Sequence, residues 1–245
     1  MLNWYPVFWA NLLNWRKQYR RFFISGLIRP FFYLMIFVLG IGRRIPLTQG
    51  DYLHFIVPGL LTLIIVNHSF SDVVGWFTLR KNYFRILDFY LLAPNSIWSF
   101  LLGNSLGSML KSILGAGVLL IIANFFAVYL KLSLLFFLTI TALAFIFSSL
   151  AVIVSLLCKS ERDTVTFSTL VITPMTFLCG TFFPLERLPL VLQKIAWCSP
   201  VTPGVYALRS LALGHSCPPW VAILILIWTI ITFYLAGCLL AREES

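Results

Sequence analysis

Charged residues are scarce in this sequence. They make up 11% of the 245 residues, and only 8 are acidic, whereas an average soluble domain has about 25% charged residues. Hydrophobic residues make up 60%, and the mean hydropathy is +0.94. So few charges cannot cover a water-exposed surface, which excludes an ordinary soluble globular protein. The composition predicts a chain that is covered largely by lipid.

Motifs of nucleotide-binding and metal-dependent enzymes are also absent. The sequence contains no phosphate-binding loop of the form G-x-x-x-x-G-K-[ST], no G-x-G-x-x-G and no H-E-x-x-H. None of the five cysteines forms a C-x-x-C pair, so neither a zinc site nor a redox motif is indicated. We therefore expect no catalytic residues, no metal and no cofactor bound by this chain. Uphill transport would need a partner protein or an ion gradient.

Basic residues outnumber acidic ones, 18 to 8, and give a formal net charge of +10. They lie between long apolar runs, a pattern that favours membrane orientation and contact with anionic headgroups over nucleic-acid binding. Cys198 and Cys217 fall in one expected outer loop, where a disulfide and two free thiols both stay open.

Six apolar stretches are long enough to cross a bilayer. A membrane helix needs roughly 20 mainly apolar residues, because each residue adds about 1.5 Å against a core about 30 Å thick. The stretches are 22–42, 53–76, 97–125, 132–157, 164–183 and 220–240. The sequence therefore predicts an all-α polytopic membrane protein with about six spans, which form a single transmembrane domain over residues 1–245.

The distribution of Lys and Arg predicts the orientation of these spans. One side of the membrane would hold Arg16, Lys17, Arg20, Arg21, Arg80, Lys81, Arg85, Lys159, Arg162 and Arg242. The other side would hold Arg43, Arg44, Lys131, Arg187, Lys194 and Arg209. Because cytoplasmic loops are richer in basic residues, both termini are predicted to be cytoplasmic.

Residues 1–21 combine Trp, Tyr, Phe and Leu with a basic cluster. Their helical spacing suits an amphipathic helix that lies flat in the membrane interface. The alternative is an ordinary positive flank with aromatic anchors before the first span, and the two interpretations are compatible.

Residues 77–96 form the longest expected cytoplasmic loop. The segment is amphipathic and ends at Pro94, which stops a helix. Such a helix outside the membrane needs a surface to pack against, either on a partner protein or on its own bundle.

Residues 184–219 contain six prolines around two short apolar segments, Leu188 to Trp197 and Gly204 to Leu213. Each segment is too short to span the bilayer. The segments therefore predict either re-entrant helices that dip into the outer leaflet or a folded outer cap.

Few ionisable residues fall inside the expected spans. Lys111 is a possible substrate contact, although a lysine can also extend its charge to the interface. Asp72 is expected at the cytoplasmic end of its span, which also carries His54 and His68 without the spacing of a metal site. A small-residue face on 97–125 predicts close helix packing; it comprises Gly103, Gly107, Ser108, Ser112 and Gly115.

The region from Phe177 to Leu213 resembles the type 2 ABC exporter permease family. The resemblance rests on Phe177–Pro184, Leu188-Pro189, Leu192-Gln193, Pro200–Pro203 and Arg209, in that order. The family signature residues carried over are Gly180, Pro184, Leu188, Pro189, Pro200 and Arg209. The basic aromatic N-terminus and the stretch Leu91–Pro94 extend the resemblance along nearly the whole chain. The sequence Gly180–Pro184 is most similar to that of nodulation-factor and antibiotic exporter permeases.

This resemblance implies a half-transporter in the cytoplasmic (inner) membrane. Two permease copies as a homodimer, or one copy with a close relative, would pair with two cytoplasmic ABC ATPase subunits, which would bind ATP and Mg. Residues of the 77–96 loop would form a coupling helix seated on the ATPase; they are Arg80, Lys81, Arg85, Asp88, Ala93 and Pro94. The family's cargoes are amphiphiles: lipo-oligosaccharides, lipid-linked polysaccharides or hydrophobic drugs.

Two other functions remain open from the residues alone. A membrane-embedded enzyme acting on lipid-linked sugars would need His54, His68, Asp72 and Lys111 to converge. A gradient-driven carrier would need an ionisable residue at mid-membrane, for which Lys111 is the candidate.

Overall fold

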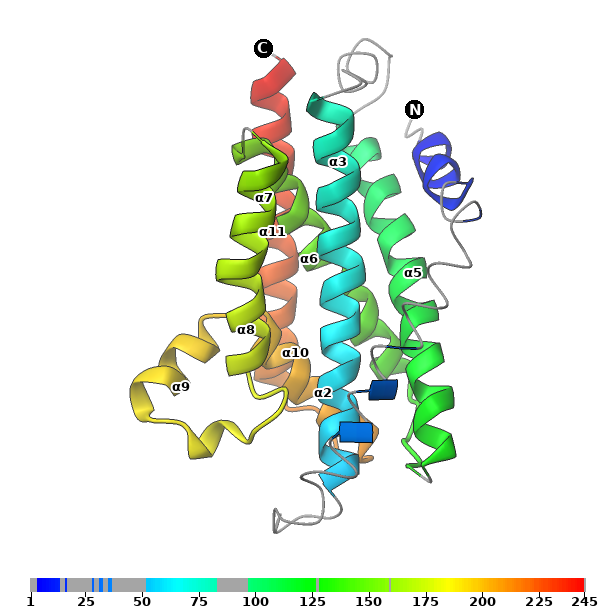
Figure 1. Cartoon of the computed structure of the whole chain (residues 1–245), viewed down its shortest axis with the longest axis vertical. Helices are drawn as coiled ribbons and strands as arrows, with labels where there is room; N and C mark the ends of the chain where they lie inside the picture. Colours follow the sequence, from blue (N-terminus) through cyan, green and yellow to red (C-terminus); the bar gives the residue numbers. More distant parts are fainter. Residues whose placement is uncertain are drawn as a thin grey trace.

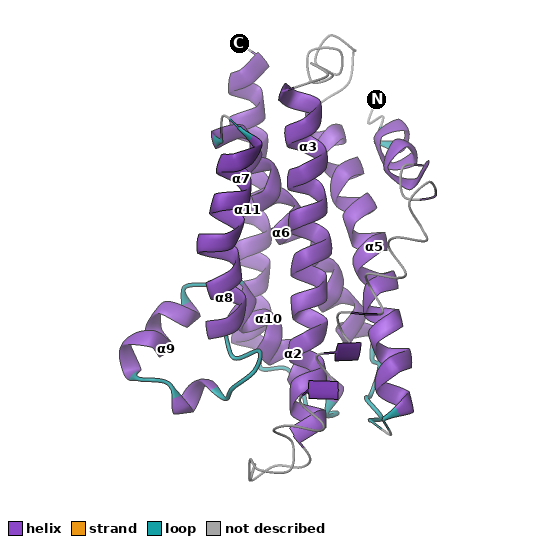
Figure 2. Cartoon of the chain, in the orientation of Figure 1, coloured by secondary structure: helices purple, strands orange, loops and turns teal. Residues whose placement is uncertain are grey.

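The described part of the chain is helical throughout. The computed structural model describes residues 4–13, 16, 28, 31–32, 35–36, 52–82, 97–126, 128–158 and 160–244, with side chains left out at 79–82 and 243–244. Within these ranges helices alternate with loops, and no strand occurs (Figure 2). The prediction of an all-α protein is confirmed for these residues.

Four helical stretches in the described ranges are long and apolar enough to cross a membrane. The first joins α2 (Tyr52–Val66), the π-helical turn η2 (Asn67–Ser71) and the start of α3 (Asp72–Asn82). The others are α5 (Ile97–Phe125), α6 (Leu134–Leu157) and α11 (Pro219–Glu244). With 24 to 29 residues each and a rise of about 1.5 Å per residue, each exceeds a hydrocarbon core about 30 Å thick.

The first and fifth of the expected spans are not among these four helical stretches. Residues 22–42 lie almost entirely outside the described residues. The fifth corresponds to α7 (Glu161–Phe167), η3 (Ser168–Ile172) and α8 (Thr173–Leu178), which follow one another without a break. Its first turn carries three charged residues and a capping box between Ser160 and Asp163, so its apolar part is short. The total of six spans stays a prediction.

Helix α6 lies at the centre of the bundle. It packs against α5, α3, α10 and α11, and its inward side chains Ile140, Leu143 and Phe147 are fully buried. By contrast, α11 exposes one apolar face, on which Ile223, Leu226 and Ile230 are each more than half exposed. Because apolar side chains outside the bundle need a nonpolar solvent, this face of α11 is suited to lipid.

Small residues bring the N-terminal helical segment 5–13 and α2 close to α5. A Cβ atom added at Gly103 would meet Val7, one at Gly107 would meet Asn11, and one at Gly115 would meet His68. A pair of hydroxyls also joins the adjoining turn η2 to α5, since the Oγ atoms of Ser69 and Ser112 lie 2.8 Å apart. The predicted packing role of the small-residue face is confirmed.

The short helices lie at one end of the bundle. They are η4 (Leu185–Arg187), α9 (Leu190–Trp197) and α10 (Val201–Ala212), close to the two short apolar segments expected from the sequence. Figure 1 shows α9 and α10 at the lower end, whereas the segment 5–13 (blue), the end of α3 and the C-terminus of α11 lie towards the upper end. The segment 5–13 and the C-terminal ends of α3 and α11 therefore lie towards the same end of the molecule.

All five cysteines are free thiols. Cys198 is exposed and Cys217 is partly buried, and burial raises the pKa of the Cys217 thiol. Both lie in the connections around α9 and α10, which the pattern of basic residues predicts to be on the outer side of the membrane.

We expect a membrane-impermeant maleimide to label Cys198 and Cys217 from the outside of intact cells. Cys198 should react faster, because it is more exposed and the raised pKa of Cys217 lowers its thiolate fraction at neutral pH. Raising the pH towards 9 should narrow the difference. The two labelling rates are measured by gel shift on single-cysteine variants. Labelling that occurs only after the cells are lysed would contradict the predicted orientation.

Candidate functional site

The loop between α8 and η4 packs directly on α2. Gly59 in α2 faces the backbone of Thr181, and a Cβ atom there would overlap the Thr181 carbonyl oxygen. Gly180 has a φ of 80°, a left-handed conformation that glycine adopts without steric cost. The phenolic oxygen of Tyr52 donates to the Phe182 carbonyl at 3.4 Å. Glycines at two positions thus allow this loop to reach the helix.

Arg209 joins α10 to both partners of this contact. Its Nη2 donates to the Gly180 carbonyl at 2.8 Å, and its Nε donates to the Phe55 carbonyl at 3.3 Å. The guanidinium also lies over the Phe55 ring, 3.6 Å from the centroid. Burial lowers the pKa of Arg209 to about 10, while Glu186 acts in the opposite direction. The group therefore stays charged at neutral pH, and we call this arrangement the outer clamp.

Prolines of the signature stand at the starts of the short helices. Pro184 precedes η4, Pro189 precedes α9, and Pro200 precedes α10. A proline suits the start of a helix because its missing N–H would have no helical partner there. Leu188 ends η4 immediately before Pro189. The signature residues therefore either set helix boundaries or, as Gly180 and Arg209 do, build the outer clamp.

A second polar group lies deeper in the bundle, where η2 and α3 face α5. The Lys111 Nζ is 3.8 Å from the Asp72 Oδ2, and the same oxygen is 3.6 Å from the His68 Nδ1. Asp72 directly follows the π-helical turn η2, a type of distortion that is frequent at functional sites. We call these three residues the Lys111 cluster. Sequence analysis named each residue but gave no signal that joins Lys111 to Asp72.

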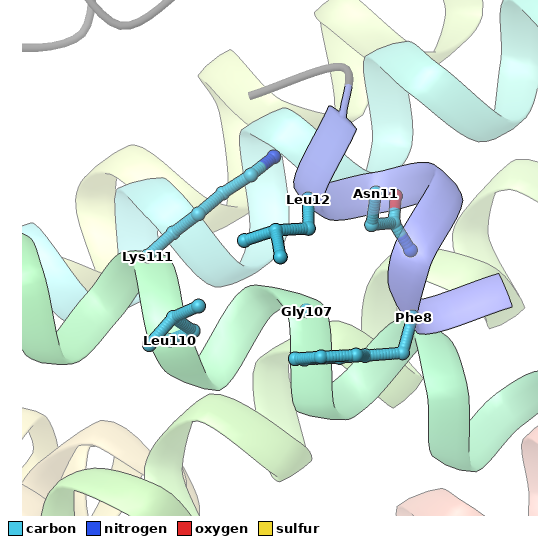
Figure 3. Close-up of a pocket in the computed structure, with 6 residues that line it drawn as sticks. All are labelled: Phe8, Asn11, Leu12, Gly107, Leu110 and Lys111. Carbon is cyan, nitrogen blue, oxygen red and sulfur yellow. The ribbon is translucent and has the colours of Figure 1, made fainter. Parts of the chain in front are cut away.

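A small cavity of about 10 Å³ adjoins the side chain of Lys111. It is lined by Phe8, Asn11, Leu12, Gly107, Leu110 and Lys111 (Figure 3). The cavity lies between the N-terminal segment 5–13 and α5, and its volume suits about one water molecule. In Figure 3 the extended Lys111 side chain passes Leu12.

The structure describes only some of the other predicted site residues. Arg80 and Lys81 lie in the last turn of α3, and their side chains are not described. Arg85, Asp88, Ala93 and Pro94 fall outside the described residues. His54 lies near the start of α2, more than three helical turns from His68, so the four residues required by the enzyme alternative do not converge.

Two enzyme-like patterns find no support in the described part of the chain. No group of three or more His, Cys, Asp or Glu side chains there could hold a metal ion. The sequence Gly103–Gly107 has the form G-x-S-x-G, but it lies inside α5, and its Ser105 Oγ is 3.0 Å from the Ser148 Oγ. A serine nucleophile of this motif needs a sharp turn between strand and helix.

Comparison with known proteins identifies relatives along the whole chain. The family described as "ABC-2 type transporter" matches residues 4–213. Nodulation protein J of Rhizobium leguminosarum bv. trifolii is 28% identical over 250 residues, covering 99% of this chain and 94% of that protein. The inner membrane transport permease YadH of Escherichia coli K12 is 28% identical over 240 residues, covering 94% and 93%.

We expect Gly59→Ala to destabilise the protein by about 1–3 kcal/mol, because the added methyl group meets a backbone carbonyl that cannot turn away. Gly75→Ala is the matched control in the same span, since a Cβ there has no neighbour within 4 Å. Thermal unfolding of the two variants in detergent provides the comparison. Equal stability would show that the loop does not pack on α2.

Arg209→Met should destabilise the outer region by about 1.5–3 kcal/mol, because it removes the two hydrogen bonds from a charged donor. Arg209→Lys should recover only part of this loss, since an ammonium group cannot reproduce the planar fork and the ring contact. Arg187→Met removes an exposed outer charge and serves as the control. Proteolysis at α9 and α10 as rapid in Arg187→Met as in Arg209→Met would contradict the clamp.

Proposed function

The chain belongs to the ABC-2 type transporter family, and from this premise we propose that it exports an amphiphilic cargo together with separate ATPase subunits. Membership of this family identifies the chain as a membrane permease subunit of an ABC exporter. The match over residues 4–213 and the full-length similarity to a transport permease are the observations on which this rests. The chain is a multi-pass protein of the inner membrane and acts as a transporter subunit.

We assign six spans with both termini in the cytoplasm. Four spans are described, and residues 22–42 and 164–183 would supply the other two. The shared location of the segment 5–13, the end of α3 and the end of α11 supports one common side for the termini and the 77–96 loop (Figure 1). Residues 1–21 would then form the interfacial helix, held against α5 by Gly103 and Gly107.

We assign the region 184–219 to the outer face as a re-entrant element. Helices α9 and α10 have 8 and 12 residues, too few to cross the bilayer. Nine residues of α10 are buried, whereas Leu190, Val191 and Ile195 of α9 are exposed. An apolar exposed helix beside a buried one suits entry of α9 into the outer leaflet, with Arg209 fixing α10 to α2.

ATP hydrolysis would occur on a partner. The chain has no phosphate-binding loop, so ATP and Mg would bind the ABC ATPase subunits. The segment 77–96 would seat on that subunit through Arg80, Lys81, Arg85, Asp88, Ala93 and Pro94. Two copies of this chain would form the complete pathway as a homodimer.

The proposed cargo is an amphiphile, such as a lipo-oligosaccharide, a lipid-linked polysaccharide or a hydrophobic drug. Similarity to Nodulation protein J supports the first of these. The low charge of the described spans suits a lipid-like molecule. Lys111 is the residue that we propose to contact it.

Co-expression with the cognate ABC ATPase subunit tests the assignment. Wild-type permease should co-purify with the ATPase and change its rate of ATP hydrolysis. Charge reversal at Arg85 or Asp88 should weaken the association at least about tenfold while leaving membrane insertion intact, because docking charges fix orientation and register. Arg187→Glu, on the opposite face, is the control. Normal coupling in both variants would remove the coupling-helix assignment, and an ATPase that ignores the wild-type permease would refute the exporter.

A further inference from the structure

The ion pair of the Lys111 cluster is loose and partly open. Lys111 lies midway along α5, and Asp72 lies in the second half of the facing span. Their 3.8 Å separation exceeds the 2.7–2.9 Å of a tight charge-assisted hydrogen bond. The side chains of Lys111 and Asp72 are 20% and 38% exposed. In a medium of low dielectric, a purely structural pair gains most when it is closed and buried. This pair is instead loose and partly exposed, so its charges are accessible to a third group.

The two charges differ in how many partners they have. Asp72 lies 3.8 Å from the Lys111 ammonium and 3.6 Å from the His68 ring nitrogen, so it has two possible donors. Among the described residues, Lys111 has one carboxylate, that of Asp72. If an anion engages Lys111, Asp72 can turn to His68. If a cation engages Asp72, Lys111 is left without its carboxylate inside the membrane, which is costly. The cluster therefore favours an anionic visitor.

The side chain of Lys111 lines a small cavity beside the N-terminal segment 5–13. The cavity of about 10 Å³ beside it shows that its aliphatic part is not fully packed. Leu12, which lines this cavity, belongs to the N-terminal segment, and the chain continues from there into a basic sequence with Arg16, Lys17, Arg20 and Arg21. Basic residues beside a bilayer attract anionic headgroups. An amphiphile with an anionic headgroup is therefore the kind of molecule that this basic sequence would attract.

We propose that the Lys111 cluster is an intramembrane site for the anionic headgroup of the cargo, in which the headgroup replaces Asp72 as the partner of the Lys111 ammonium. Asp72 then acts as a built-in competitor that neutralises Lys111 when the site is empty, and His68 receives the displaced carboxylate. This inference rests on the proposed export function and narrows the cargo to amphiphiles that carry a phosphate or carboxylate.

The test uses the purified full-length chain and two lipids with the same acyl chains, dioleoyl phosphatidylglycerol and dioleoyl phosphatidylcholine. Native mass spectrometry measures their relative binding. Wild type should prefer the anionic lipid, and Lys111→Met should lose that preference. Asp72→Asn should strengthen it by at least about threefold, because a competing negative charge is removed. A preference for the anionic lipid that falls in Lys111→Met and rises in Asp72→Asn supports the site.

If the ion pair had only a structural role, both variants would destabilise the bundle, and both would weaken the binding of the anionic lipid. Same-sign losses, or no change in either, overturn the inference. Lys131→Met and Glu161→Gln remove one charge of each sign elsewhere and control for net charge. If Lys111→Met does not fold, the rise or fall of the anionic-lipid preference in Asp72→Asn still decides. Lys111→Arg should keep the preference for the anionic lipid, because it keeps the positive charge.

A final arm separates a cargo from a resident lipid. With the ATPase subunits, ATP and Mg, bound phosphatidylglycerol should exchange faster during turnover than with ADP. Retention through turnover would assign the site to a resident lipid and overturn the cargo role. If the permease does not change the rate of ATP hydrolysis, the proposed export function fails. The changes in lipid binding of the Lys111 and Asp72 variants still decide whether the anion site exists.

Discussion

Water does not solvate the interior of a helical bundle in a bilayer, and this constraint governs how polar groups are arranged in the chain. The hydroxyls of Thr139 and Thr229 donate to the carbonyl four residues earlier, which satisfies them without leaving their own helix. Ser69 and Ser105 instead meet a hydroxyl on a neighbouring helix. Because the hydrophobic effect does not drive helices together in lipid, such contacts and the small residues around them hold the bundle together.

The same constraint distinguishes the surroundings of Arg209 from those of Lys111. Arg209 is closed: two backbone carbonyls and the Phe55 ring surround a planar group whose donors point in fixed directions. Lys111 is open, with a single loose carboxylate partner among the described residues and a cavity beside its aliphatic part. A guanidinium held on three sides suits a permanent bracket between helices. An ammonium with one loose partner suits exchange, so the two residues fit different tasks at different depths.

The sequence predicted the elements whose existence depends on local apolar length. Residues 97–125 form α5 with the expected bounds, and the stretches 132–157 and 220–240 correspond closely to α6 and α11. It did not predict the π-helical turns η2 and η3, because an inserted residue in a helix depends on what packs against that turn and leaves no mark in hydropathy. Helix α3 also continues past 76 to Asn82, since polar residues at its end are compatible with a helix outside the lipid.

The site was harder to predict because its contacts join distant positions. Arg209 and Phe55 are 154 residues apart, and no spacing rule links them. Asp72 and Lys111, however, follow from one further step. Ser69 precedes Asp72 by three residues and Lys111 precedes Ser112 by one, so the serine contact between η2 and α5 brings the two charged side chains close together. A helical side chain leans towards the N-terminus of its helix, which carries the Lys111 ammonium towards Asp72. The ion pair therefore accords with the helix register that the Ser69–Ser112 contact indicates.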